Sequence, residues 1–150
     1  MNPMPPSTTS SVSRPSASPT FKEIVDALAA WSFPPAIDGV VAIATGGIVP
    51  GALVAQHLRL DLKTIAISFR NEINEPQFEQ PRLVSDVPGL GGWRRVLLVD
   101  DVYLSGRSLE TARAHLPKSA EILPFVLIGD VDFALFRRPP ALRRWPWTAG

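Results

Sequence analysis

The sequence has 150 residues, of which 45% are apolar, and this size and composition fit one globular domain with a single core. Its 15 basic and 14 acidic residues give a formal net charge of +1, which argues against a nucleic-acid backbone as the main partner. Cysteine is absent, which excludes disulfides, thiol nucleophiles, iron–sulfur clusters and cysteine zinc sites. The aliphatic runs, such as 40–44 and 96–99, are too short to span a bilayer, so we expect a soluble protein with no membrane partner.

Residues 1–19 are rich in Pro, Ser and Thr, and Arg14 is their one charged side chain. Such a composition buries too little apolar surface to offset the entropy of ordering, so it predicts a disordered leader. The segment has no apolar core behind a basic start, and we do not expect a secretory signal. The ordered domain is predicted to cover 20–150.

A first helix is predicted from residue 21 to about Trp31. Thr20 and Glu23 form a capping box, and apolar residues follow at helical spacing: Phe21, Ile24, Val25 and Leu28. The prolines at 34 and 35 prevent its continuation.

A strand, a glycine turn and a second helix follow. Residues 39–44 are a continuous apolar run, which is typical of a strand buried on both faces. The turn Thr45-Gly46-Gly47 leads into a helix that starts near Pro50, since proline suits the first turn of a helix. Residues 64–69 predict a second strand, so that this unit is a right-handed parallel crossover.

The rest of the chain continues the alternation of strands and helices. Residues 70–92 have little periodicity, and a loop of this length is usually functional or disordered. The further elements predicted are a strand at 95–99, a helix at 108–116, a strand at 121–128 and a short apolar piece at 131–136. Pro124 indicates an edge position or a bulge in the last of these strands. The pattern predicts an α/β fold with a parallel-dominated twisted sheet flanked by helices.

The most informative segment is 96–109. A buried strand ends in Asp100 and Asp101, and a turn with Ser105, Gly106 and Ser108 then opens a helix. In open α/β sheets ligands bind outside the carboxyl ends of the strands, where this turn should lie. Backbone N–H groups at a helix N-terminus suit a phosphate, and paired carboxylates suit vicinal hydroxyls or Mg²⁺, directly or through water. The combination indicates a phosphorylated sugar, although an Asp-Asp pair taken alone is as often a solvated turn.

This segment resembles the sugar-phosphate motif of the type I phosphoribosyltransferases. That motif is four hydrophobic residues, two acids, a hydrophobic residue, two variable ones and Thr/Ser-Gly-x-Thr/Ser, which 96–108 match in order. The stretch 45–55 is similar to the pyrophosphate loop and following helix of the xanthine–guanine phosphoribosyltransferases. Trp145-Pro146-Trp147 is similar to the Pro-Trp of their base-covering hood, which would correspond to 130–150.

The resemblance implies a Mg²⁺-dependent transfer of ribose 5-phosphate from 5-phosphoribosyl-1-pyrophosphate (PRPP) to a nucleobase, a purine in the first instance, with release of pyrophosphate. Asp100 and Asp101 would be the catalytic pair, binding the ribose hydroxyls and the metal. The 5′-phosphate would lie on Leu104, Ser105, Gly106, Arg107 and Ser108. The loop 70–92 would close over the reactants.

The resemblance also assigns the pyrophosphate and the base. Pyrophosphate would bind Thr45, Gly46 and Gly47, where members of the family often hold a non-proline cis peptide bond. The aromatic candidates to stack on the base are Phe133 and Trp145, with Leu142 and Trp147 as further apolar candidates. A homodimer and a cytoplasmic location are expected on the same ground.

Three positions depart from the pattern of the purine enzymes. Many of these enzymes have Asp where this chain has Leu104, a cation where it has Thr45, and Lys near Asp130. A leucine can neither accept nor donate a proton, so the acceptor stays open. The alternatives are a non-catalytic protein of this fold that binds PRPP or a nucleotide for regulation, and a transferase acting on an amine other than a nucleobase.

Overall fold

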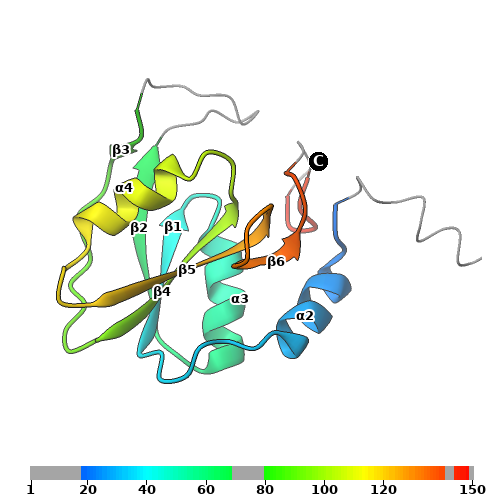
Figure 1. Ribbon diagram of the computed structural model, residues 1–150, viewed down its shortest axis with the longest axis horizontal. Coiled ribbons are helices and arrows are strands. Elements are labelled where there is room, and N and C mark those ends of the chain that lie inside the picture. Colours follow the sequence, from blue (N-terminus) through cyan, green and yellow to red (C-terminus); the bar gives the residue numbers. More distant parts are fainter. Residues whose placement is uncertain (1–17, 69–79, 141–143, 149–150) are drawn as a thin grey trace, which may run out of the picture.

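The computed structural model describes residues 18–68, 80–140 and 144–148, and within them six strands form one sheet (Figure 1). The order across the sheet is β3-β2-β1-β4-β5-β6. The strands are β1 (Gly39–Ala44), β2 (Leu62–Ser68), β3 (Arg82–Leu83), β4 (Arg95–Val102), β5 (Glu121–Gly129) and β6 (Ala134–Arg137). The helices are α2 (Phe21–Ala30), α3 (Ile48–Leu58) and α4 (Arg107–His115).

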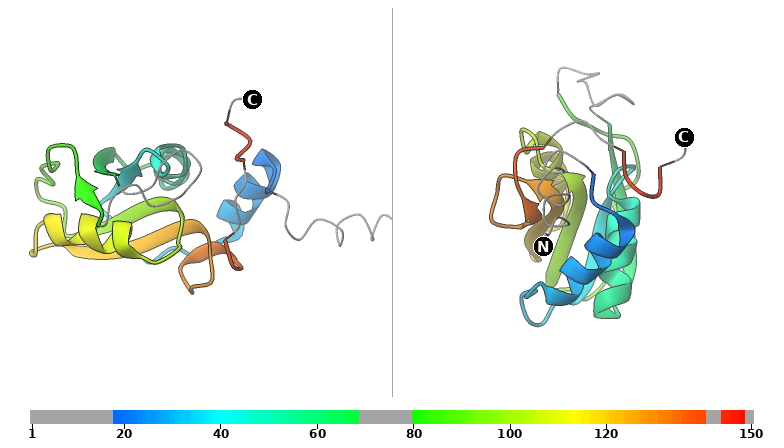
Figure 2. Two further views of the ribbon diagram at one scale, coloured as in Figure 1. Left: turned by 90° about the horizontal axis from the view of Figure 1, so that it is seen from above. Right: turned by 90° about the vertical axis from the view of Figure 1, so that its right-hand side faces the viewer.

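The sheet is parallel except at one edge, where β3 pairs antiparallel with β2. One face is covered by α4 and the other by α2 and α3 (Figure 2). Alternate residues of β1 serve the two faces, since Val41 packs with α4 and Val40 packs with α2 and α3. Both faces are therefore buried, which explains why the central strands read as continuous apolar runs. The predicted α/β class and the parallel-dominated sheet are confirmed.

The N-terminal helix and its connector are fixed to the sheet by local capping and by aromatic packing. The capping box of Thr20 and Glu23 is present, and α2 ends at Ala30 with Trp31 as its C-cap. The rings of Trp31 and Phe33 then lie 5.5 and 5.1 Å from the ring of Phe125 on β5. The Asp38 carboxylate accepts the backbone N–H groups of residues 94 and 95 at 2.7 and 2.9 Å.

The predicted loop 70–92 was wrong in its second half. Residues 82–83 form β3, whose register pairs Ile67 with Leu83, and Leu90 is buried. Two residues of strand are too few to show a period-2 pattern, so the sequence carried no signal for them. The first part of that loop lies outside the described residues, as does the predicted leader apart from residues 18 and 19.

The strand that contains Pro124 is not an edge strand along its whole length, because β5 lies between β4 and β6. The partner strand β6 pairs only with Val126, Ile128 and Gly129, so β5 has a neighbour on one side alone at Pro124. A missing N–H group is tolerated at such a local edge.

Several element ends also differ from the prediction. The helix α3 begins at Ile48, two residues before Pro50, which still lies in its first turn. The strand β4 runs on to Val102, so the two aspartates belong to its end, and residues 134–137 form the strand β6. In the part of the chain that the structure describes, no helix has the length and the apolar character needed to cross a membrane.

Truncating Phe125 should lower the free energy of unfolding by about 3–5 kcal/mol, because its side chain is 1% exposed and touches both connector rings. The measurement is urea denaturation of Phe125→Ala. The matched control is Phe21→Ala, where the ring is 49% exposed and a change of less than about 1 kcal/mol is expected. Equal losses in the two variants would contradict this account of the core.

Candidate functional site

The candidate site lies where the chain reverses its direction across the sheet. From β1 the chain continues to β2 on one side, and from β4 it continues to β5 on the other side. The helix that follows β1 covers one face and the helix that follows β4 covers the opposite face. The loops after β1 and β4 therefore diverge, and ligands of open α/β sheets bind in the crevice that such divergence opens.

The loop after β1 is pressed against the end of β4. A Cβ atom on Gly47 would lie 2.5 Å from the carbonyl oxygen of Val99 and 2.7 Å from that of Ile43. A side chain at this buried position would displace backbone, so glycine is required. The peptide bond between Ala44 and Thr45 is cis, in the loop where the resemblance implied one.

The Asp101 carboxylate joins this loop to two other segments. A Cβ atom on Gly46 would lie 2.7 and 2.8 Å from its two oxygens. Its Oδ1 accepts the backbone N–H of Val102 at 2.8 Å. Its Oδ2 accepts the indole N–H of Trp145 at 3.2 Å, and Trp145 lies 44 residues further along the chain. The predicted pyrophosphate loop, the predicted sugar motif and the C-terminal segment thus meet at one carboxylate.

The neighbouring Asp100 has an altered protonation equilibrium. Burial raises the pKa of its carboxyl well above the ordinary value of 3.8, and the negative charge of Asp101 acts in the same direction. The backbone N–H of Asp101 donates to Asp100 Oδ1 at 2.8 Å, which opposes this shift. Two adjacent carboxyls, one of them holding its proton more tightly, are typical of a functional site.

The turn after the aspartates borders an open cavity at the N-terminus of α4. Gly106 is the N-cap of α4 and has φ +81°, a left-handed conformation that favours glycine. The backbone N–H of Arg107 donates to Ser105 Oγ at 3.4 Å. A cavity of about 250 Å³ lies here, lined by Ser105, Gly106, Arg107, Glu110, Thr111, Gln80 and Pro81. Of the other predicted phosphate-binding residues, Leu104 is 38% exposed and Ser108 is half-buried; neither lines the cavity.

Gln80 and Pro81 also line this cavity; they belong to the predicted loop 70–92, but the sequence did not single them out within it. They end the segment that precedes β3, and only the pairing of β3 with β2 carries them to the cavity beside α4. Tyr103 also contributes, because its hydroxyl lies against Gly106 and its ring packs edge-on to Phe133 at 5.4 Å. The ring of Tyr103 thereby packs against the turn that precedes α4.

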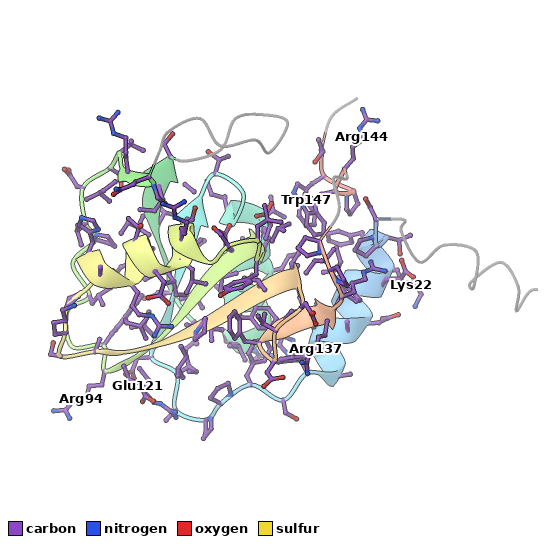
Figure 3. The ribbon with its side chains drawn as sticks, turned by 45° about the horizontal axis from the view of Figure 1, so that its top comes forward. Lys22, Arg94, Glu121, Arg137, Arg144 and Trp147 are labelled. Atoms are coloured by element: carbon purple, nitrogen blue, oxygen red, sulfur yellow. The ribbon has the colours of Figure 1, made fainter. Side chains whose placement is uncertain are left out.

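The aromatic candidates for the base lie in different surroundings. Phe133 is half-buried and belongs to the face of the sheet that α4 covers. Trp145 is 9% exposed and is stacked on Trp147, with the ring centroids 5.2 Å apart. Figure 3 shows Trp147 and Arg144 at one end of the molecule and Arg94 and Glu121 at the other. Glu121 is the first residue of β5, and Arg94 directly precedes β4. Leu142 lies outside the described residues.

The oxygen ligands at this site suit Mg²⁺ in kind. Among the described residues no group of three or more His, Asp or Glu side chains could hold a metal ion. Protein-bound Mg²⁺ usually takes one or two carboxylates, and substrate phosphates and water complete its coordination. Asp100 and Asp101 supply such a pair, so the residues present fit a metal that arrives with a phosphorylated substrate.

Replacing Asp100 by Asn should stabilise the ligand-free protein at neutral pH. The folded-state pKa of Asp100 is raised above 3.8, so the wild-type protein loses stability as the pH rises from about 4 through that raised value. Asparagine keeps an oxygen for the N–H of Asp101 and carries no charge, so the melting temperature at pH 7 should rise by about 3 °C or more. Thermal melts from pH 4 to pH 8 measure the difference.

The gain in Asp100→Asn should shrink toward pH 4, where the wild-type carboxyl is itself neutral. Asp86→Asn is the control, because that side chain is exposed and should give a difference that varies little with pH. A gain for Asp100→Asn that is constant from pH 4 to pH 8 would contradict the assignment of the shift to this group.

Comparison with known proteins agrees with this geometry. A family model described as the phosphoribosyl transferase domain matches residues 12–121. The chain is 35% identical over 83 residues to a xanthine-guanine phosphoribosyltransferase of Nitratidesulfovibrio vulgaris (strain DP4), a match that covers 54% of this chain and 48% of that protein. The chain thus spans about half the length of the curated relatives it matches.

Solved structures share the fold. A purine phosphoribosyltransferase from Pyrococcus horikoshii Ot3 superposes with a TM-score of 0.67 at 24% identity, over 89% of this chain and 95% of that chain. The xanthine-guanine-hypoxanthine phosphoribosyltransferase of Helicobacter pylori gives a TM-score of 0.68 at 13% identity, over 87% of this chain and 92% of that chain. The sheet, its flanking helices and the extent of the family match show that the chain belongs to the phosphoribosyl transferase domain family and has the type I phosphoribosyltransferase fold.

Proposed function

We propose that the protein is a phosphoribosyltransferase that transfers ribose 5-phosphate from PRPP to a nucleobase, with a purine as the preferred acceptor. The observation that carries the proposal is the position of Asp100 and Asp101, at the end of β4 between the cis-containing loop and the cavity at the N-terminus of α4. The family match and the names of the curated relatives support the same reaction.

In this proposal the cavity holds the 5′-phosphate. Ser105, Gly106 and Arg107 line it, and the first backbone N–H groups of α4 supply donors and the positive end of the helix dipole. Leu104 directly precedes these residues, and Ser108 is the second residue of α4. The pyrophosphate then lies on the loop of Thr45, Gly46 and Gly47, on the other side of the two carboxylates.

The reaction breaks the bond between the anomeric carbon and the pyrophosphate oxygen, and the electron pair leaves with pyrophosphate. A nitrogen of the base forms the new bond and loses its proton. Positive charge develops on the ribose in the transition state, and the carboxylates of Asp100 and Asp101 stabilise it. Asp100 and Asp101 would hold Mg²⁺, which would supply positive charge against the leaving pyrophosphate.

The acceptor and its proton are the least constrained part of the proposal. Leu104 is 38% exposed beside the turn and cannot take the proton that the base must lose. Phe133 and Trp145 remain candidates for contact with the base. Because of Leu104 we keep a second candidate function, the binding of PRPP or a nucleotide for regulation without turnover. Homodimer formation and a cytoplasmic location stay predictions from the resemblance.

Release of pyrophosphate separates the two functions. The purified protein is mixed with PRPP, Mg²⁺ and, in turn, guanine, xanthine, hypoxanthine, adenine, orotate and uracil. The proposal predicts pyrophosphate release that depends on a purine, and loss of this release when the metal is chelated. Binding of PRPP without release on any base would favour the regulatory protein. Absence of PRPP binding would exclude the transferase and a regulatory protein that binds PRPP.

Two substitutions test the Asp101 carboxylate and the loop that packs against it. Asp101→Asn should weaken PRPP binding by about tenfold or more without unfolding the protein, because it removes the charge that the ribose hydroxyls meet. Gly46→Ala should do the same, because its Cβ would come within 3 Å of the Asp101 carboxylate. Calorimetry measures both affinities.

Gly92→Ala is the matched control for Gly46→Ala. An added Cβ at Gly92 meets no atom of the described residues within 4 Å, and Gly92 precedes β4 at the end opposite to Asp101. Its affinity for PRPP should equal that of the wild type. If Gly46→Ala also binds with wild-type affinity, the loop after β1 is not part of the site.

A further inference from the structure

A buried indole from the C-terminal segment contacts the carboxylate at the centre of the proposed site. Trp145 Nε1 donates to Asp101 Oδ2 at 3.2 Å. The side chain of Trp145 is 9% exposed, so this hydrogen bond is largely protected from water. A buried indole N–H needs an acceptor, and here the acceptor is a residue of the sugar motif.

The segment that carries the indole is held in place by its own contacts. The backbone N–H of Thr148 donates to the carbonyl oxygen of Trp145 at 2.9 Å, and the backbone N–H of Trp145 donates to Thr148 Oγ1 at 3.3 Å. The ring of Trp147 stacks on Trp145 at an interplanar angle of 6°. Both rings pack in the cluster that includes Ile24 and Leu28 of α2. The donor therefore has a defined position relative to the sheet.

The Asp101 carboxylate is thereby held from two sides. Its Oδ1 accepts from the backbone of Val102, and Gly46 closes one approach to both oxygens. The indole sets the direction of Oδ2. A carboxylate oxygen can accept two hydrogen bonds, so Oδ2 can take the indole N–H and a ribose hydroxyl together.

We propose that Trp145 is a positioning residue, whose indole N–H orients the Asp101 carboxylate toward the ribose of the substrate. This inference rests on the proposed function, because it gives Asp101 a ribose to bind. The proposed role uses the indole N–H of Trp145 and is separate from stacking of its ring on a base. A binding side chain that its neighbours already hold in position loses less conformational freedom when the ligand binds than one that must be ordered on binding.

The test compares Trp145→Phe with Trp147→Phe. The first removes the N–H donor and keeps an aromatic ring in the stack, and the second makes the same chemical change in the neighbouring ring. We expect about tenfold weaker PRPP binding by calorimetry for Trp145→Phe, because an Asp101 carboxylate that the indole no longer orients must be ordered when the ribose binds. Trp147→Phe should bind PRPP within about twofold of the wild type, because PRPP carries no base for the ring of Trp147 to contact. Both variants should keep the far-ultraviolet circular dichroism of the wild type.

A measurement without ligand tests the contact itself. In a ¹H–¹⁵N spectrum of the ligand-free protein, Asp101→Asn should shift the Trp145 indole resonance and speed its exchange with solvent, while the Trp147 indole changes little. A tryptophan that filled the stack without donating to Asp101 would show neither change. An unchanged Trp145 resonance overturns the inference.

The outcomes separate the two hypotheses. If the wild type binds PRPP and Trp145→Phe binds as well or more tightly, the positioning role is wrong and the proposed function stands. Equal losses in the two variants also overturn the role, because they would reflect the stack and not the N–H group. If the wild type binds no PRPP, the proposed function fails and the positioning role fails with it.

Discussion

The structure depends on the close approach of the loop after β1 to the end of β4. Gly47 packs against the carbonyl oxygens of Ile43 and Val99, and Gly46 packs against the Asp101 carboxylate. A side chain at Gly47 would push the two strand ends apart, and one at Gly46 would displace the Asp101 carboxylate. Because the sheet reverses its connection between β1 and β4, this contact also sets the width of the crevice in which a ligand can lie.

The end of β4 also carries an unfavourable electrostatic interaction between two carboxyls. Two carboxyls adjacent in sequence lie at the end of a buried strand, and burial together with the charge of Asp101 raises the pKa of Asp100. A neutral polar pair would fold with less penalty, so the arrangement is better explained by binding than by stability. A bound cation or the hydroxyls of a sugar would relieve the repulsion between the two carboxylates.

The elements that were predicted most accurately are those with the strongest local sequence patterns. The capping box of Thr20 and the apolar run of β1 depend on neighbours in the chain, and both elements were predicted within a residue. The strands β3 and β6 are short, and they exist because β2 and β5 offer them hydrogen-bonding edges. No local pattern marks such strands, and the place of β5 inside the sheet likewise follows from β6 and not from Pro124.

The sequence by itself determined the α/β class, the order of the principal strands and helices, and the pairing of Asp100 and Asp101 with the turn of Ser105 and Gly106. These features follow from periodicity, capping and spacing, which act over a few residues. Only the tertiary structure decided that Gln80 reaches the cavity and that the Trp145 indole donates to Asp101. Such contacts join residues far apart in the chain, and their existence depends on how the layers pack together, which no single segment encodes.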